Sequence, residues 1–267
     1  MPIMHETHYG SMHLYTLYGR KENTMTKQIG LKDKTVVVFG GSSGIGLGVA
    51  QLAASQGAKV VITSRKSERL GPALKEVGGD SHGEVLDATD EDAIQSFFVK
   101  QPAIDHLVFT AGDSLQFSRL HSTDLKEARR TFELRYWSAL AAVKYGSLRI
   151  RDGGSIVLTT GITSLRPMKG WAVVSSVCGS IDSLTRALAV ELAPIRVNAV
   201  SPGVVRTNFW KDMSEEQREQ FYENVGQSLL VGRVGTVEEV AQAYVYLMSN
   251  GFATGQVLVV DGGTVLV

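Results

Sequence analysis

The sequence predicts an α/β fold, a single doubly wound domain with a seven-stranded parallel sheet. From Lys34 onward, short β-branched runs alternate with amphipathic helical stretches, as in chains that wind helices around a parallel sheet. Several runs are apolar without a break, as at Val36, Val37 and Val38, which is typical of strands covered by helices on both faces. No linker rich in Pro, Gly or Ser and no internal repeat interrupts this alternation.

Seven runs share the strand pattern: 35–39, 59–63, 83–86, 106–110, 155–159, 196–200 and 257–260. Helices are expected between them, the first over 47–56 directly after the first strand. The last helix is expected to begin at a capping box formed by Thr236 and Glu239 and to end before Gly251.

The chain has 267 residues, 43% of them hydrophobic, which is enough to bury one core without disulfides or metals. We expect residues 31–267 to form that domain. Residues 1–30 show no clear period and are expected to be a poorly ordered extension. His5 and His8 could both contact a metal, but without further ligands nearby a solvated tail is the better interpretation, and no metal site is expected.

The charge balance argues against large anionic partners. Lys and Arg number 27 together, as do Asp and Glu, so no net field attracts nucleic acid or an anionic membrane. No stretch approaches the roughly 18 uninterrupted apolar residues of a membrane span, and the start lacks the apolar region of a secretory signal. The single cysteine, Cys178, forms no intrachain disulfide, which suits a reducing compartment. A soluble, cytoplasmic protein is therefore expected.

A glycine-rich turn is expected where the first strand ends. The segment 40–46 reads Gly-Gly-Ser-Ser-Gly-Ile-Gly and leads directly into a helical stretch. Such glycines allow a tight turn, let backbone N–H groups approach a pyrophosphate and permit close packing of helix on sheet. The turn therefore predicts a dinucleotide site, against the alternative of a merely structural turn. The expected contacts are Gly40, Ser42, Ser43, Gly44, Ile45 and Gly46.

The end of the second strand indicates which dinucleotide is bound. Ser64, Arg65 and Lys66 stand where an NAD-selective protein has a carboxylate for the adenosine ribose, and no acid is present there. The Ser64 hydroxyl and the Arg65 guanidinium instead offer charge-assisted hydrogen bonds to a 2′-phosphate. We therefore expect NADP(H) as the cofactor; the alternative is an exposed basic helix start.

Gly40, Gly44 and Gly46 are spaced as GxxxGxG, and with this spacing the chain resembles the short-chain dehydrogenase/reductase (SDR) family over about residues 33–265. The segment Ser201-Pro202-Gly203 and the closing stretch from Thr254 to Gly263 also match the family. The resemblance implies a Rossmann-type fold and an oxidoreductase linked to a nicotinamide cofactor.

The resemblance also implies further cofactor contacts. Asp87 stands where the family contacts the adenine ring. The segment Thr110-Ala111-Gly112 corresponds to the end of the family's Asn-Asn-Ala-Gly motif, with Thr110 in place of an Asn. Val205 and Thr207 are the expected partners of the carboxamide and the pyrophosphate.

The same resemblance locates the family's catalytic Asn, Ser, Tyr and Lys, and none of the four is present. Arg135, Gly161, Val174 and Cys178 stand at these positions in turn. Reducing a carbonyl by hydride transfer creates an alkoxide that needs a proton donor, and Val174 cannot donate a proton. Losing the Ser and Tyr hydrogen bonds is expected to cost about 3 kcal/mol or more of transition-state stabilisation. Ordinary ketone or alcohol chemistry is therefore expected to be slow.

Two of these replacements are candidate functional residues. Arg135 is a permanent cation directed toward the expected nicotinamide pocket, where burial is costly unless something anionic or polar meets it. We expect it to contact cofactor or substrate and to be the catalytic residue; the alternative is an outward salt bridge. Cys178 is interpreted as a small buried residue rather than a nucleophile, since no His or Lys is placed beside it. Trp171 and the pair Phe209-Trp210 are either aromatic walls of the pocket or packing residues.

Two functions from different classes fit this pattern. The first is an NADP(H)-dependent oxidoreductase of atypical SDR type that reduces an imine, an iminium or a similarly activated small molecule in secondary metabolism. Hydride addition to C=N⁺ gives a neutral amine without a proton donor. SDR-like proteins of fungal indole-alkaloid pathways that lack the tetrad resemble this chain in that respect. The second is an NADP(H)-binding protein without redox chemistry: a cyclase, a cycloaddition catalyst, a sensor or a pseudoenzyme.

The resemblance further implies a homodimer or homotetramer. The family usually associates through helices that correspond to the long helical stretches expected here near 124–148 and 171–192. A small-molecule substrate is the expected partner, with neither nucleic acid nor membrane.

Overall fold

The computed structural model describes residues 30–113, 115 and 117–267. Residues 1–29 of the predicted extension, with His5 and His8, lie outside this part of the chain. Seven parallel strands form one sheet: β1 (Thr35–Phe39), β2 (Lys59–Ser64), β3 (Ser81–Val85), β4 (Ile104–Phe109), β5 (Ile150–Thr159), β6 (Arg196–Pro202) and β7 (Val257–Val260).

Eight α-helices are present in the described residues: α1 (Gly44–Ser55), α2 (Ser67–Val77), α3 (Glu91–Lys100), α4 (Leu125–Phe132), α5 (Ser138–Gly146), α6 (Ala172–Glu191), α7 (Glu215–Ser228) and α8 (Val237–Ser249). Short 3-10 turns lie at Leu120–Ser122, Ser147–Arg149, Ile162–Ser164, Asn208–Trp210 and Thr264–Leu266.

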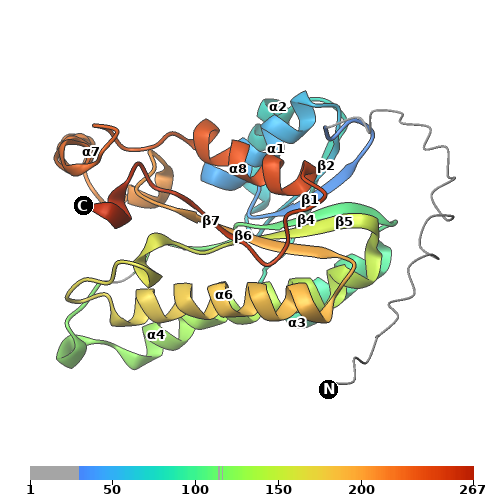
Figure 1. The fold of residues 1–267 in the computed structure, drawn as a ribbon. Coiled ribbons are helices and arrows are strands. Elements are labelled where there is room, and N and C mark those ends of the chain that lie inside the picture. Colours follow the sequence, from blue (N-terminus) through green and yellow to red (C-terminus); the bar gives the residue numbers. More distant parts are fainter. Residues whose placement is uncertain (1–29, 114, 116) are drawn as a thin grey trace, which may run out of the picture.

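The strand order is β3-β2-β1-β4-β5-β6-β7, so the predicted doubly wound parallel sheet is confirmed. Helices α1, α2 and α8 cover one face, and α3, α5 and α6 cover the other (Figure 1). The chain winds in opposite directions from β1 and from β4, and ligands of such sheets bind where the direction reverses, beyond the carboxyl ends of the strands.

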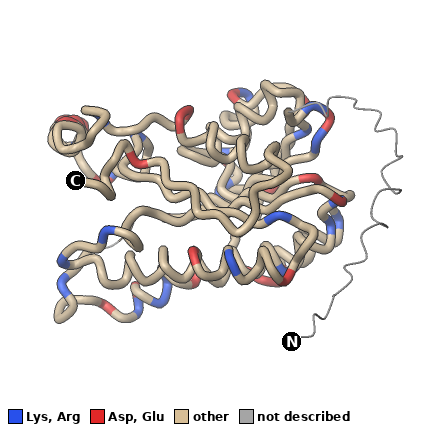
Figure 2. Tube along the Cα trace, viewed as in Figure 1, with Lys and Arg blue, Asp and Glu red and all other residues tan. Residues whose placement is uncertain are grey.

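Both faces of the central strands are buried, which explains their unbroken apolar sequence. Along β1, Val36 and Val38 pack with α1 and α8 on one face, whereas Val37 and Phe39 pack on the other. Charged residues of both signs are interspersed along the outside of the two helix layers, while the middle of the sheet carries few (Figure 2).

The predicted strands are all present, with shifted ends. β4 begins at Ile104 and stops before Thr110, and β5 begins at Ile150 rather than near Ser155. The added part of β5 includes Gly153 with a φ of 78° and a register shift against β4. Such an irregularity interrupts the alternation by which a strand is recognised in a sequence.

The long helix predicted near 124–148 is divided. α4 is followed by a wide π-helical turn, Glu133–Trp137, and then by α5. The backbone N–H of Ser138 donates to the Glu133 carbonyl, and the Ser138 hydroxyl donates to the same oxygen at 2.9 Å. π turns inside helices are frequent at functional sites, and this one carries Arg135.

Helices α8 and α6 lie where the sequence predicted helices. α8 begins at the predicted capping box: the Thr236 hydroxyl accepts from the Glu239 N–H at 3.4 Å, and the Glu239 carboxylate accepts from the Thr236 N–H at 3.0 Å. α6 is the one described helix long and apolar enough to cross a membrane by length and composition. Its residues Ile181, Leu184 and Leu188 pack against the face of the sheet that α3 and α5 also cover, so α6 is a core helix of this domain.

Candidate cofactor and substrate site

A cavity of about 1240 Å³ opens at the carboxyl ends of the strands. The volume exceeds the ~300–1,000 Å³ of a pocket for one drug-sized ligand, so it has room for two molecules. All the residues predicted to contact a cofactor line it: Gly40, Ser42, Ser43, Gly44, Ile45, Gly46, Ser64, Arg65, Asp87, Thr110, Ala111, Gly112, Arg135, Val205 and Thr207.

The glycine turn between β1 and α1 has the geometry of an anion site. Gly40 and Gly44 have φ values of 79° and 54°, a region that favours glycine. A Cβ on Gly46 would lie 2.3 Å from the Thr110 hydroxyl oxygen. Among the described residues, no side chain hydrogen-bonds as the N-cap of α1, and its first turn has no acid. The first N–H groups of α1 therefore remain available to a phosphate.

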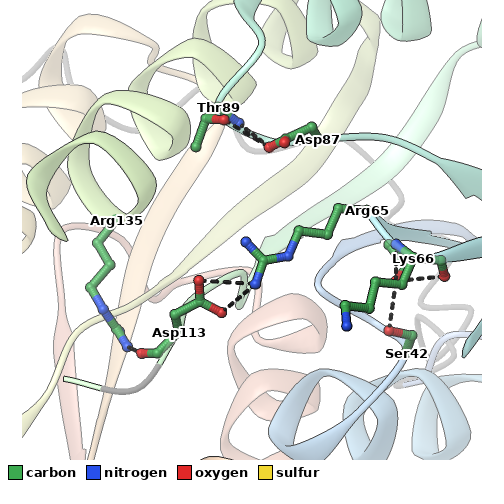
Figure 3. Close-up of polar contacts among 8 residues, drawn as sticks. Ser42, Arg65, Lys66, Asp87, Thr89, Asp113 and Arg135 are labelled. Atoms are coloured by element: carbon green, nitrogen blue, oxygen red, sulfur yellow. Dashed lines mark hydrogen bonds and ion pairs between the residues drawn. The ribbon is translucent and has the colours of Figure 1, made fainter. Parts of the chain in front are cut away.

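Hydrogen bonds join this turn to the end of β2. The Ser42 hydroxyl donates to the Ser64 hydroxyl at 3.0 Å, and the Lys66 N–H donates to the same Ser64 oxygen at 3.2 Å (Figure 3). The two predicted segments thus form one edge of the cavity, with Arg65 projecting from it.

Arg65 forms an ion pair across the cavity that the sequence did not predict. Its guanidinium contacts both carboxylate oxygens of Asp113 at 2.8 and 3.0 Å, and Arg135 donates to the Asp113 backbone carbonyl (Figure 3). The Arg65 and Asp113 side chains are 49% and 52% exposed. An ion pair this exposed contributes little to stability, so an incoming phosphate can replace it.

Asp87 lies at the predicted adenine end and is already partnered. Its carboxylate accepts from the Thr89 N–H at 2.9 Å and from the Thr89 hydroxyl at 2.8 Å (Figure 3). These bonds, the backbone one first, lower the pKa of Asp87. The side chain is therefore an ionised acceptor fixed at this end of the cavity.

Arg135 points into the cavity, so the alternative of an outward salt bridge is wrong. A Cβ on Gly112 would lie 2.9 Å from the Arg135 guanidinium carbon, which in turn lies 6.0 Å from the centre of the Phe209 ring. Burial lowers the pKa of Arg135, but a guanidinium remains a cation in proteins. No described carboxylate lies within ion-pair distance of it.

Of the positions where the family resemblance implies catalytic residues, Gly161 and Cys178 lie together in the cavity wall, whereas Val174 does not line the cavity. The Cys178 sulfur lies 3.3 Å from where a Cβ on Gly161 would be, and both residues line the cavity. Val174 is buried one turn earlier, and α6 contains neither tyrosine nor lysine. Burial raises the pKa of the Cys178 thiol, against the opposing effect of Arg135. This fits the small buried residue that the sequence predicted, although Cys178 also faces the cavity.

Aromatic side chains form the walls of this half of the cavity. The predicted Trp171 lies against Phe117 with ring centres 5.4 Å apart, and Trp210 contacts Phe209 at 4.9 Å and Phe221 at 4.7 Å. Phe117 and Phe221 were not predicted, because their places depend on the loop after β4 and on the folding back of α7. No periodic pattern in the sequence marks either of them.

Two arginines of the cavity were also missed. Arg69 lines the cavity one helical turn after Arg65, a spacing that could have been noticed in the sequence. Arg166 lines the opposite end from the loop after β5 and donates to the Thr264 carbonyl. Within the described residues, no three His, Cys, Asp or Glu side chains are placed to hold a metal.

Comparisons with known proteins agree with this architecture. Residues 40–265 match the family model described as enoyl-(acyl carrier protein) reductase. The short-chain dehydrogenase/reductase ucsE of Acremonium sp is 34% identical over 255 residues, which cover 88% of this chain and 97% of that protein. A small-chain dehydrogenase solved in complex with NADPH has a TM-score of 0.79 at 34% identity and covers 88% of this chain and 100% of its own.

The MalC reductase/Diels-Alderase of Malbranchea aurantiaca has a TM-score of 0.83 at 31% identity, covering 89% of this chain and 98% of its own. The family-model match, the identity to ucsE and the shared sheet topology agree with the glycine spacing at Gly40, Gly44 and Gly46. The chain belongs to the short-chain dehydrogenase/reductase family.

Proposed function

We propose that the protein is an NADP(H)-dependent reductase of atypical SDR type, acting on an activated small molecule in secondary metabolism. The observation that carries the proposal is the contrast between the two halves of one cavity. The cofactor half has its glycine turn, basic residues and helix N-terminus in place. The other half has Arg135 in the site and no tyrosine or lysine on α6.

NADP(H) is the cofactor that these residues favour. The N–H groups of the glycine turn would hold the pyrophosphate, and Arg65 with Arg69 would hold the 2′-phosphate. The similar protein solved with NADPH supports this choice. When bound, NADPH supplies a hydride to an electrophilic carbon and leaves as NADP⁺.

The substrate should be an electrophile that does not need the missing tyrosine. In an imine, an iminium or a conjugated carbonyl, the hydride forms a C–H bond and the displaced π electrons move to nitrogen or oxygen. An iminium thereby becomes a neutral amine. A neutral imine or enone becomes an anion, which the Arg135 guanidinium stabilises by hydrogen bonding until water delivers a proton. Arg135 is therefore the proposed catalytic residue.

NADPH oxidation tests the proposal. The purified protein is incubated with NADPH and a cyclic imine, its N-methyl iminium, a conjugated enone or a simple cyclic ketone, and loss of the reduced nicotinamide absorbance is followed. We expect oxidation with at least one activated electrophile and little with the ketone. Arg135→Gln should lower kcat/KM by about 10²-fold, the scale of one oxyanion donor. Arg130→Gln, on the exposed side of α4, is the matched control.

A second function, cyclisation or cycloaddition without net redox change, is favoured by one observation. The cavity is large and aromatic, and the similar MalC protein is named both a reductase and a Diels-Alderase. NADPH binding without oxidation of NADPH by any member of the panel would favour this function. Failure to bind NADPH at all would contradict both.

We also propose a homodimer or homotetramer that associates through α4, α5 and α6. These helices lie on one outer side of the sheet and leave Leu125 63%, Trp137 53% and Val190 82% exposed (Figure 1). Leu125→Asp combined with Val190→Asp is expected to reduce the mass measured by light scattering, because charges oppose burial in an interface. Val85→Asp, at the edge strand β3 and 59% exposed, should leave the mass unchanged. A monomeric wild type would contradict the proposal.

A further inference from the structure

The two halves of the cavity differ in charge. Its acidic lining residues are Glu68 and Glu76 on α2, Asp87 after β3 and Asp113 after β4. We call the part of the cavity around Arg65, α2 and Asp87 the adenosine side. Asp113 belongs to it as well, because its carboxylate is turned toward Arg65 (Figure 3). We call the remainder the substrate half; among its lining residues are Phe117, Arg135, Arg166, Trp171, Cys178, Phe209, Trp210, Lys211 and Phe221.

Two arginines from different elements line the substrate half. Arg135 comes from the π turn between α4 and α5, and Arg166 from the loop after β5. Among the described residues, each guanidinium makes one hydrogen bond, to the backbone carbonyl of Asp113 or of Thr264. A guanidinium has five N–H donors, so most of them remain for a ligand.

Among the described residues, no acid lines the substrate half, although the Asp113 charge still acts on Arg135 from the adenosine side. The two undescribed positions in the nearby loop are Ser114 and Gln116, which are not acids either. Asp182, one turn beyond Cys178 on α6, does not line the cavity and accepts a hydrogen bond from the Ser164 hydroxyl at 2.7 Å. Lys211 lines the rim and adds a further positive charge.

The rest of this wall is apolar and aromatic. The rings of Phe117 and Trp171 form one side, and those of Phe209, Trp210 and Phe221 form another. In such surroundings water is partly excluded, so charge interactions are stronger than at an exposed surface. Two guanidinium groups there, with the nearby Asp113 carboxylate paired to Arg65, favour an anion over a cation.

We propose that the substrate half selects an aromatic or polycyclic molecule that carries an acidic group, namely a carboxylate or an acidic enol of a β-dicarbonyl, and excludes cations. This inference rests on the proposed reductase function and narrows it: iminium ions are disfavoured, whereas neutral or anionic conjugated electrophiles are accepted. One arginine holds the acidic group, and the other faces the oxygen or nitrogen on which negative charge develops.

Binding of three matched probes tests the inference without turnover. Naphthoate, naphthylmethanol and naphthylmethylammonium share a ring system and differ in charge. Their Kd values are measured by calorimetry in protein saturated with NADPH, because the reduced nicotinamide ring is neutral and adds no preference of its own. We expect naphthoate to bind at least about tenfold more tightly than the alcohol, with the ammonium weakest, on the scale of one hydrogen bond between charged groups.

Variants of Arg135 and Arg166 test whether these two side chains cause the preference for the anionic probe. Arg166→Gln and Arg135→Gln should each weaken naphthoate binding about tenfold and leave naphthylmethanol nearly unchanged. Arg135→Lys keeps the charge and should retain most of the preference. Arg130→Gln, on the exposed side of α4 with its side chain 78% exposed, should change nothing. Circular dichroism and thermal unfolding show that each variant is folded.

Equal affinity for the anionic and cationic probes would overturn the inference, as would an anion preference that survives both Arg→Gln changes. These outcomes are separate from failure of the reductase proposal. A protein that never oxidises NADPH can still show the predicted order of probe affinities. Rapid oxidation of NADPH by an N-methyl iminium, without charge selection among the probes, would retain the reductase and reject the substrate class.

Discussion

At the scale of single residues, the Arg65–Asp113 ion pair occupies the place where a 2′-phosphate is expected. Both oxygens of Asp113 contact one Arg65 nitrogen, and both side chains are about half exposed. In the proposed site, NADPH would exchange the carboxylate for its phosphate, and a remaining carboxylate would repel that phosphate. We therefore expect the cofactor preference to depend on this pair of residues rather than on Arg65 alone.

Substitutions of Arg65 and of Asp113 should change the Kd of NADPH in opposite directions. Arg65→Ala should raise the Kd of NADPH about tenfold or more, the scale of a hydrogen bond to a charged group, and should change the Kd of NADH little. Asp113→Asn should lower the Kd of NADPH a few-fold, since it removes a competing anion. Fluorescence titration with both cofactors measures these changes. Equal affinity of the wild type for NADPH and NADH would rule out the assignment.

Cys178 offers a second prediction at this scale. Burial raises the pKa of its thiol, so the reactive thiolate is scarcer near neutral pH than for an ordinary cysteine. Alkylation by iodoacetamide in the folded protein should be about tenfold or more slower than in urea, and its rate should still rise with pH where that of a free thiol has levelled off. Arg135→Gln should slow it further, because the opposing cation is removed. Fast labelling of folded protein at neutral pH would show a reactive thiol instead.

At the scale of elements, the glycines of the β1–α1 turn act through backbone geometry. A Cβ on Gly46 would meet the Gly40 carbonyl oxygen at 2.4 Å and the Thr110 hydroxyl oxygen at 2.3 Å. Neither atom can easily move, since one belongs to the turn and the other follows β4. The turn and the start of α1 are therefore a single unit with the strands beside them.

Two glycine substitutions test whether the close contacts of Gly46 stabilise the β1–α1 turn. Gly46→Ala should destabilise the protein by about 1–3 kcal/mol, as overpacking does, and weaken NADPH binding. Gly71→Ala is the control, because Gly71 is exposed on α2 and no atom beyond its chain neighbours and the backbone of its own helix lies within 4 Å of its Cβ position. It should change stability by less than about 0.5 kcal/mol, because the following Pro72 opposes the gain in helix propensity. Thermal unfolding and NADPH titration measure both effects. Equal effects of the two substitutions would show that the close contacts of Gly46 are not important.

At the scale of the whole molecule, a buried histidine ties stability to pH. His106 lies in β4, where its Nδ1 is 2.9 Å from the Ser155 hydroxyl. Burial lowers the pKa of His106 from 6.5 to about 4; Asp105 opposes this shift, whereas Arg196 and Lys34 add to it. The unfolded chain therefore binds a proton below pH 6.5 that the folded protein refuses until about pH 4.

This difference in proton binding makes the protein less stable as the pH falls. The contribution of His106 to stability is complete above its unfolded pKa and is lost as pH falls toward its folded pKa. Between pH 6.5 and pH 5 the loss should be about 2 kcal/mol. Urea unfolding at both pH values should show a smaller loss for His106→Asn than for the wild type. His121→Asn, at an exposed position, should behave like the wild type. Parallel losses in all three proteins would show that His106 does not titrate in this way.

Several features were predictable from the sequence because local geometry encodes them. The turn from Gly40 to Gly46 needs glycine for its φ angles and its close contacts, whatever surrounds it. The capping box at Thr236 joins residues only three positions apart. The strands followed from burial on both faces, and only their ends were displaced, as in β5 near Gly153.

The sequence by itself determined the fold class, the glycine turn and the absence of tyrosine and lysine from α6. Tertiary structure alone decided that Arg135 faces the cavity, that Asp113 pairs with Arg65 and that Arg166 lines the same cavity. Arg65 and Asp113 are separated by 48 positions, and Arg166 and Thr264 by 98. Such contacts depend on sheet order and on loops without a period, which no local pattern in the chain records.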